Sequence, residues 1–154
     1  MKLGATILAG LFGTTGMTLF SYMVAYLEKE NFKEPELLNL LIQRLPNNNT
    51  GQTHLMPGWV LHYTLGCLWA IVYSGSLDRL NKKPATKRAL LFGLFGGTIG
   101  VYAWKFLFKW HPQPPQLSYT PFYRQLFIAH ILFALFTSKV FAIQLEKEQE
   151  FTKR

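Results

Sequence analysis

Charged residues are scarce in this chain of 154 residues, and they lie between long apolar stretches instead of being spread among them. Asp, Glu, Lys and Arg make up 16% of the sequence and apolar residues 49%. A soluble domain typically has roughly 25% charged residues and interleaves polar with apolar positions, so that each helix or strand keeps one wetted face. The absence of that interleaving argues against a soluble fold.

Cysteine is nearly absent, since Cys67 is the one cysteine and lies inside an apolar stretch. A single cysteine cannot form a disulfide within the chain, so the sequence gives no basis for a disulfide-stabilised secreted fold. The hydrolase, phosphate-loop and zinc-protease patterns of common enzymes are also missing. The glycine-rich stretch at 93–100 lies inside an apolar run and does not follow a strand, which excludes a nucleotide loop. We therefore favour a non-enzymatic protein.

Four apolar stretches are long enough to cross a membrane as helices. A bilayer core of about 30 Å requires roughly 20 helical residues. The first stretch is longer than the roughly 7–15 apolar residues of a signal peptide, which favours a retained helix. The sequence predicts an all-α integral membrane protein, a single domain over 1–154 built as a bundle of four transmembrane helices. The predicted spans are 3–27, 57–77, 89–108 and 122–143.

A shorter helix is predicted between the first two spans, over residues 35–45. Pro35 suits the first turn of a helix, and apolar residues follow it at helical spacing, too few for a span. These residues are Leu37, Leu38, Leu41, Ile42 and Leu45. The pattern predicts a short amphipathic helix at the membrane interface. A helix packed against the bundle is the alternative.

The net charge of +8 comes from basic residues at the ends of the apolar stretches. This distribution suits the flanks of membrane spans better than a nucleic-acid-binding face, so we expect contact with the lipid bilayer and no nucleic-acid partner. The loop 78–88 alone holds five Lys and Arg residues. In a four-span protein both termini lie on the same side as this loop, and the positive-inside rule makes that side the cytoplasm.

The first and third spans share a motif, GLFGTT at 10–15 and GLFGGT at 93–98, identical at five of six positions. In the second and fourth spans a histidine heads a row of small residues four apart, which lie on one helix face. The two rows are His62, Gly66, Ala70 and Ser74, and His130, Ala134, Ser138 and Ala142. This similarity favours a duplicated helical hairpin, and chance similarity of span composition is the alternative.

Glycines within the spans are candidates for helix packing. In lipid, close approach of two backbones replaces the hydrophobic effect as the force that holds helices together. The candidates are Gly10, Gly13, Gly16, Gly66, Gly93, Gly96, Gly97 and Gly100. They predict a tight bundle. Contact of one glycine face with a second chain, in a homo-oligomer or a larger membrane complex, is the alternative.

His62 and His130 form the candidate polar site within the membrane. Both are predicted in the outer halves of their spans, and the two rings approach each other if the rows of small residues face the bundle axis. The simplest role is structural, with each neutral imidazole bonded to a Thr or Tyr of the next helix. The available partners are Thr14, Thr15, Thr18, Tyr22, Tyr63, Tyr73 and Thr98.

Two functional alternatives use the same histidines. Ionisable groups inside a membrane often serve proton or solute movement, although no Asp or Glu lies in the middle of a predicted span. Two histidines on facing helices are also suited to haem, or to a metal ion if further ligands join them, because a metal site wants three or four ligands. No cofactor is predicted, and haem and metal stay open.

The stretch HYTLGCLWA at 62–70, the four spans and the glycine-rich first and third spans together resemble small four-span bacterial inner-membrane proteins of unknown function. The resemblance implies an inner-membrane location and assigns no site residues. Our leading interpretation is a non-enzymatic structural or accessory role in a membrane complex. The alternatives are a small transporter or proton-linked channel that uses His62 and His130, and a haem- or metal-binding redox subunit.

Overall fold

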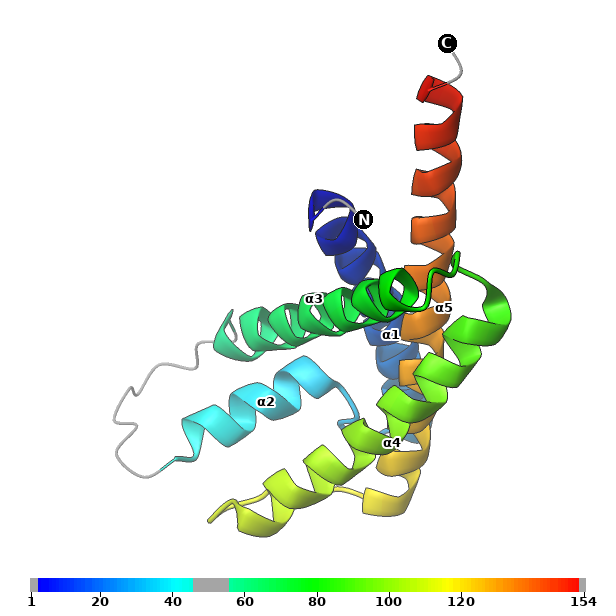
Figure 1. The fold of residues 1–154 in the computed structure, drawn as a ribbon. Helices are drawn as coiled ribbons and strands as arrows, with labels where there is room; N and C mark the ends of the chain where they lie inside the picture. Colours follow the sequence, from blue (N-terminus) through cyan, green and yellow to red (C-terminus); the bar gives the residue numbers. More distant parts are fainter. Residues whose placement is uncertain (1–2, 46–55, 153–154) are drawn as a thin grey trace.

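The computed structural model describes residues 3–45 and 56–152, and it is all-helical over these residues. A short helix, α2 (Glu34–Gln43), lies between the first two long helices (Figure 1). The fold predicted from the sequence, four spans and a short helix between the first two, is confirmed. The four helices long and apolar enough to span a membrane are α1 (Leu3–Glu28), α3 (Met56–Arg79), α4 (Thr86–Trp110) and α5 (Tyr119–Thr152).

The observed helices extend past some of the apolar stretches that predicted them. α4 begins at Thr86, within the basic loop, and α5 continues through the charged tail to Thr152. Apolar length marks the part of a helix that crosses a membrane, whereas Gln, Glu and Lys are good helix formers in water. The predicted start of the third span at 89 and the predicted end of the fourth span at 143 therefore mark the limits of the apolar stretches. The helices themselves extend further.

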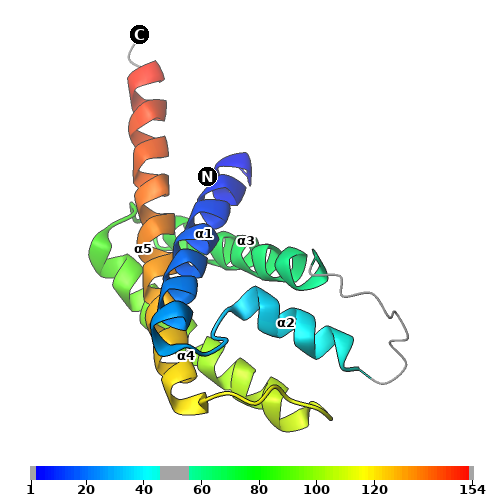
Figure 2. The same cartoon turned by 180° about the vertical axis from the view of Figure 1, so that it is seen from behind.

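The long helices form two pairs around a central contact. α1 and α5 pack against each other, while α3 packs on α1 and α4 packs on α5 (Figures 1 and 2). α3 and α4 meet near their connecting loop, where Trp69 and Tyr73 pack on Phe92 with ring centroids 5.6 and 4.7 Å apart. Away from this loop the two helices diverge (Figure 1).

α2 fills the space between the diverging ends of α3 and α4. A turn brings the chain back after α1, with Lys29 in the left-handed region at φ 56°, and the Glu30 N–H bonds to the Ala25 carbonyl at 3.2 Å. Leu37, Leu38 and Leu41 of α2 are then buried in one cluster with aromatic residues of α4 and α5. The short helix expected between the first two spans is confirmed, and its leucines pack against the bundle.

Glycines lie at the helix crossings of both pairs. A Cβ on Gly10 would lie 2.9 Å from the Cα of Cys67, and one on Gly93 would lie 2.7 Å from the Cα of Ile131. The two backbones are in contact at each of these crossings, which only glycine allows. The remaining candidates lie against a neighbouring helix: Gly13 and Gly16 against α5, Gly66 against Thr14, and Gly96, Gly97 and Gly100 against α5. The duplicated hairpin stays a prediction.

The outer surface of the bundle is largely apolar. Leu19, Leu91 and Phe106, on α1 and α4, are each at least 60% exposed. Side chains of this kind suit contact with lipid acyl chains, and their exposure to water would be costly. The exterior agrees with a multi-pass membrane protein.

Candidate functional site

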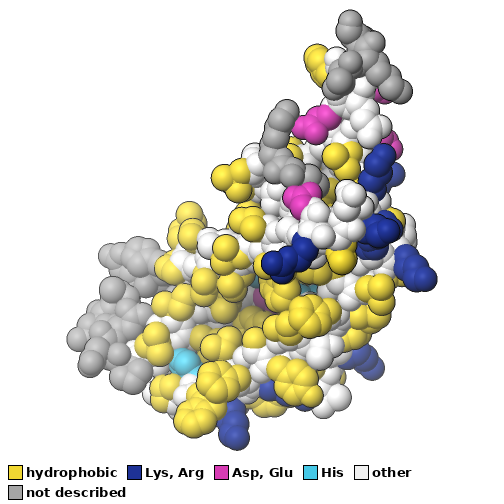
Figure 3. Space-filling model, in the orientation of Figure 1, with side chains coloured by type: hydrophobic (Ala, Val, Ile, Leu, Met, Phe, Trp, Pro, Cys, Tyr) yellow, Lys and Arg dark blue, Asp and Glu magenta, His cyan; other side chains and the backbone are white. Residues whose placement is uncertain are grey.

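A cavity of about 180 Å³ lies where α3 and α4 diverge, and Figure 3 shows a hollow at this place in a largely apolar face. All five helices contribute to its lining. The ionisable groups in the lining are Glu34, His62 and His130. The rest is apolar or aromatic, with side chains such as Leu65, Trp69, Ile99, Trp104 and Phe133. The two histidines singled out in the sequence therefore meet at one cavity, together with a carboxyl group.

His62 is held by a threonine on the neighbouring helix. The ring is 7% exposed, and its Nε2 lies 2.9 Å from Oγ1 of Thr18. The Thr18 hydroxyl donates its single hydrogen to the carbonyl oxygen of Thr14 at 2.7 Å, so it must accept a hydrogen bond from His62 Nε2–H. In the neutral ring Nδ1 is then a hydrogen-bond acceptor. The expected partner, a threonine or tyrosine of the next helix, is confirmed for His62.

His130 is held by its own helix. Its Nδ1 lies 2.8 Å from the carbonyl oxygen of Leu126, and a carbonyl only accepts, so Nδ1–H donates. Nε2 is therefore the acceptor of the neutral ring. Gly100 of α4 makes room for this ring, because a Cβ there would lie 2.7 Å from Nε2. Unlike His62, His130 finds its partner in a backbone carbonyl and not in a Thr or Tyr.

Glu34, the first residue of α2, supplies the carboxyl group of the site. It is 1% exposed, and its Oε1 accepts a hydrogen bond from Gln125 Nε2 at 3.0 Å. The same oxygen lies 2.7 Å from Ser21 Oγ, whose single hydrogen is shared between Glu34 and the Met17 carbonyl oxygen at 3.0 Å. Oε2 is buried and has no hydrogen-bond partner among the described residues. Burial raises the pKa of this carboxyl group, and the hydrogen bonds from Gln125 and Ser21 oppose the rise only in part.

Gln125, like the Glu34 carboxyl group that it contacts, has a buried oxygen without a hydrogen-bond donor in the described part of the chain. Its amide nitrogen donates to Glu34 Oε1 and, at 3.2 Å, to the carbonyl oxygen of Phe32, while its own Oε1 is buried without a partner among the described residues. Two bonded neighbours thus each carry an unsatisfied acceptor. A buried acceptor without a donor costs about 1–3 kcal/mol, so this corner of the bundle favours a proton or another donor.

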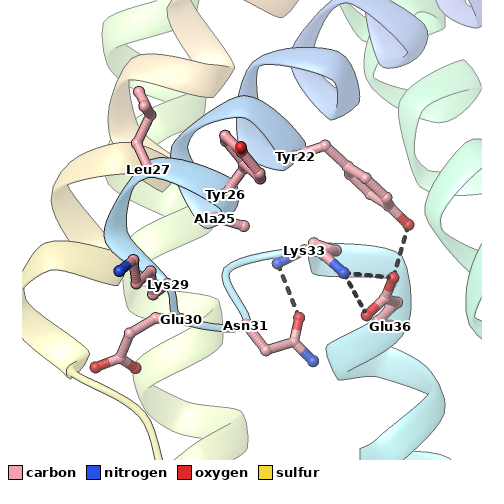
Figure 4. A pocket seen from close by; sticks show the side chains of 9 residues that line it. All are labelled: Tyr22, Ala25, Tyr26, Leu27, Lys29, Glu30, Asn31, Lys33 and Glu36. Atoms are coloured by element: carbon pink, nitrogen blue, oxygen red, sulfur yellow. Dashed lines mark hydrogen bonds and ion pairs between the residues drawn. The ribbon is translucent and has the colours of Figure 1, made fainter.

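A second hollow, of about 840 Å³, lies at the turn between α1 and α2 (Figure 4). Two of its charged residues, Lys33 and Glu36, pair with each other. Lys33 Nζ lies 3.1 Å from Oε1 of Glu36, and the Tyr22 hydroxyl donates a hydrogen bond to the same oxygen at 3.0 Å (Figure 4). Lys33 also lies 5.1 Å from the centroid of the Tyr22 ring. This network fixes the start of α2 on α1, and it thereby positions Glu34.

Within residues 3–45 and 56–152, no three His, Cys, Asp or Glu side chains are grouped as a metal site would require. Glu34, His62 and His130 are therefore spread along the cavity wall and do not converge on one point. Binding of haem or of a metal ion by the two histidines stays a prediction.

Glu34 is the residue that sequence reasoning missed. It lies outside the predicted spans, and an acidic residue in the first turn of a helix is ordinarily explained by the helix dipole. The one signal in the sequence is its setting, since Phe32 precedes it and Leu37 and Leu38 follow. Such a segment can be buried, but its position against α1 and α5 follows from tertiary packing.

Fold and cavity together define a four-span helical membrane protein with ionisable groups buried at a cavity inside the bundle. No family model, curated protein or solved structure matches this chain. Its function must therefore be inferred from the geometry of the cavity.

Proposed function

We propose that this protein is a small proton-linked transporter, in which Glu34 binds the proton while His62 and His130 line the solute path. The observation that carries the proposal is the Glu34 carboxyl group, which is 1% exposed, has one unpartnered oxygen and lines the same cavity as both histidines. Ionisable groups buried within a membrane bundle are costly and mark solute or proton paths by default.

This proposal ranks above the accessory role that the sequence favoured. The sequence argues against proton-linked transport because no Asp or Glu lies in the middle of a predicted span, whereas Glu34 of α2 contributes a carboxyl group to the cavity lining. If the buried position of Glu34 were purely structural, an apolar side chain would fill it at a lower free-energy cost. A buried ionisable group must either stay neutral or be paired.

The packing of the helices suggests how the cavity opens and closes. α3 packs on α1 and α4 packs on α5, so these helices belong to two different pairs, which are joined through the contact between α1 and α5. A change in the angle between the pairs widens or closes the cavity and leaves each pair intact. Shear and hinge movements of packed helices are common in switching proteins.

The location that we propose is the inner membrane, with both termini in the cytoplasm. The loop between α3 and α4 is rich in Lys and Arg, and basic loops stay on the cytoplasmic side. α2 and the cavity then face the outer half of the membrane.

Transport is tested in liposomes that contain the purified protein and a trapped pH-sensitive dye. With a pH gradient imposed, tetramethylammonium, methanesulfonate and glycerol are added outside in separate experiments. We expect one of them to drive proton movement in the wild type, and we expect the movement to be lost in Glu34→Gln. Glu28→Gln, which changes an exposed carboxyl group at the end of α1, is the matched control and should behave as wild type.

Two results would contradict proton-linked transport. The first is that none of the three solutes moves protons beyond the level of empty liposomes. The second is that Glu34→Gln moves them as well as the wild type. Circular dichroism and gel filtration establish that the variants are folded.

A further inference from the structure

We infer that the cavity binds small organic cations, with an alkylammonium group held beside the Glu34 carboxylate. This inference rests on the proposed transport function and names the class of solute that the same site takes. It is drawn from four features of the cavity: its hydrogen-bonding groups, its aromatic walls, its size and its charge.

The ionisable groups of the lining offer hydrogen-bond acceptors. Glu34 has a free Oε2, while His62 and His130 each donate from one ring nitrogen to the protein and keep the other as an acceptor. Hydrogen-bond acceptors in the lining favour a ligand that carries hydrogen-bond donors. A protonated amine carries N–H donors, one of which would satisfy Oε2 of Glu34, whereas a carboxylate or a phosphate would offer only acceptors.

The apolar part of the wall suits the alkyl portion of such a cation. Trp69, Trp104 and Phe133 contribute aromatic rings to the lining, and ammonium ions are attracted to aromatic faces. The volume of about 180 Å³ is close to the roughly 150 Å³ of an engineered cavity that binds benzene. The cavity therefore matches an amine with a small branched or cyclic alkyl group.

The charge of the surroundings favours a cation. No Lys or Arg is among the described residues that line the cavity. Lys105, a basic residue in the span α4, lies over the rings of Tyr102 and Tyr123, at 5.8 and 5.2 Å from their centroids. A positive ligand would therefore be opposed by no fixed positive charge of the wall.

The titratable side chains around Glu34 come from several helices. They are Tyr22 on α1, Glu36 on α2, His62 on α3 and His130 on α5, and α4 contributes no charged residue to the cavity lining. When the alkylammonium ion binds, the protonated Glu34 carboxyl group releases its proton to water and becomes a carboxylate. The cation replaces the proton, so the charge of the cavity is unchanged by the exchange.

Binding is measured with three ligands of the same shape: tert-butylammonium, tert-butanol and pivalate. The protein is kept in detergent, and ligand binding is followed by tryptophan fluorescence, because Trp69 and Trp104 line the cavity. We expect the cation to bind at least about tenfold more tightly than either of the other two. In weakly buffered solution its binding should release about one proton per protein.

Variants assign the effect to the carboxyl group. Glu34→Gln should weaken tert-butylammonium binding by about thirtyfold or more and abolish the proton release, because it removes one partner of a buried charge pair. Glu28→Gln should bind as wild type. If Glu34→Gln is poorly folded, the wild type alone provides the test, since its affinity for the cation should rise with pH while that for tert-butanol should not.

The inference is overturned if pivalate or tert-butanol binds as tightly as the cation, if Glu34→Gln binds the cation normally, or if none of the three ligands binds. Each of these results is separate from failure of the proposed transport. In the liposome experiment, proton movement driven by methanesulfonate or glycerol would support transport and exclude cations as the solute class. The absence of all movement would remove the proposed function itself.

Discussion

At the scale of single residues, the chemistry of the cavity follows from how each side chain satisfies its hydrogen bonds. His62 and His130 each donate one N–H to an oxygen atom of the protein, and these hydrogen bonds fix the tautomer of each neutral ring in the absence of a ligand. Glu34 differs because one of its two oxygens is left without a donor. A buried carboxyl group in this condition is more stable with its proton, which makes it the group most responsive to pH.

Glu34 is expected to contribute a loss of stability as pH rises. The unfolded carboxyl group loses its proton near the ordinary pKa of 4.5, whereas burial raises the pKa in the folded protein. Between the two values only the folded state holds the proton, so stability is fully present below the lower value. It is lost at up to about 1.4 kcal/mol per pH unit as pH rises through the higher one.

The measurement is the melting temperature of the detergent-solubilised protein across a series of pH values. The melting temperature of the wild type, relative to that of Glu34→Gln, should fall as pH rises, because the amide does not titrate. All other titrating groups are shared, so they cancel in the comparison. Equal slopes for the two proteins would show that Glu34 does not hold its proton in the folded state.

Two glycines of α4 give a matched test of the packing around His130. A Cβ on Gly100 would lie 2.6 Å from Cε1 of the ring, whereas a Cβ on Gly96 would have its nearest neighbour, His130 Cδ2, at 3.8 Å. Gly100→Ala should therefore lower the free energy of unfolding by about 1–3 kcal/mol. Gly96→Ala should leave it unchanged or raise it by up to about 1 kcal/mol through helix propensity. Thermal melting compares the two, and equal effects would contradict the packing described.

At the scale of helices, α2 is the element that builds the site, and it does so through polar contacts as well as leucines. Oδ1 of Asn39 accepts a hydrogen bond from the Gly58 N–H at 2.6 Å, which satisfies a free donor in the first turn of α3. This cap therefore comes from another helix. It ties α2 to the start of the helix that carries His62.

Removal of this cap should loosen α2 and α3 together. We expect Asn39→Ala to lower the free energy of unfolding by about 1–2 kcal/mol, since it leaves a buried N–H without an acceptor. Asn31→Ala is the matched control, because Asn31 accepts a longer bond of 3.3 Å from the Lys33 N–H in a turn. Chemical or thermal unfolding in detergent distinguishes them, and a loss that is equal for both variants would rule out the cap.

The elements differ in how far the sequence predicts them. The four spans follow from apolar length, because the thickness of a bilayer fixes how many apolar residues a helix needs. The position of α2 does not follow, since its leucines suit either a membrane surface or a groove between helices. Glu34 was missed for that reason: its role depends on contacts with Ser21 and Gln125, which lie in other helices and are far from periodic patterns.

At the scale of the whole molecule, the two ends of the bundle differ in charge. In both views of the fold the chain termini and the α3–α4 loop lie toward one end, and α2 lies toward the other (Figures 1 and 2). Lys and Arg side chains gather near that loop on the face seen in Figure 3. The positive-inside rule predicts this basic end on the cytoplasmic side, and the orientation stays a prediction.

Reporter fusions test the orientation. Green fluorescent protein joined to the C-terminus should fluoresce, and alkaline phosphatase joined within the segment 111–118, between α4 and α5, should be active outside the cytoplasm. The same phosphatase joined after Asn81, in the α3–α4 loop, is the control and should be inactive. The reverse pattern of phosphatase activity would mean that the cavity faces the inner half of the membrane.

Infrared spectroscopy of the protein in lipid vesicles measures the protonation of Glu34 most directly. A protonated carboxyl group has a C=O stretching band that a carboxylate lacks. We predict that this band persists at a pH where exposed carboxyl groups have ionised, that it weakens when tert-butylammonium is added, and that Glu34→Gln removes it. Absence of the band at that pH, or its persistence in Glu34→Gln, would contradict a proton held by Glu34 at the cavity.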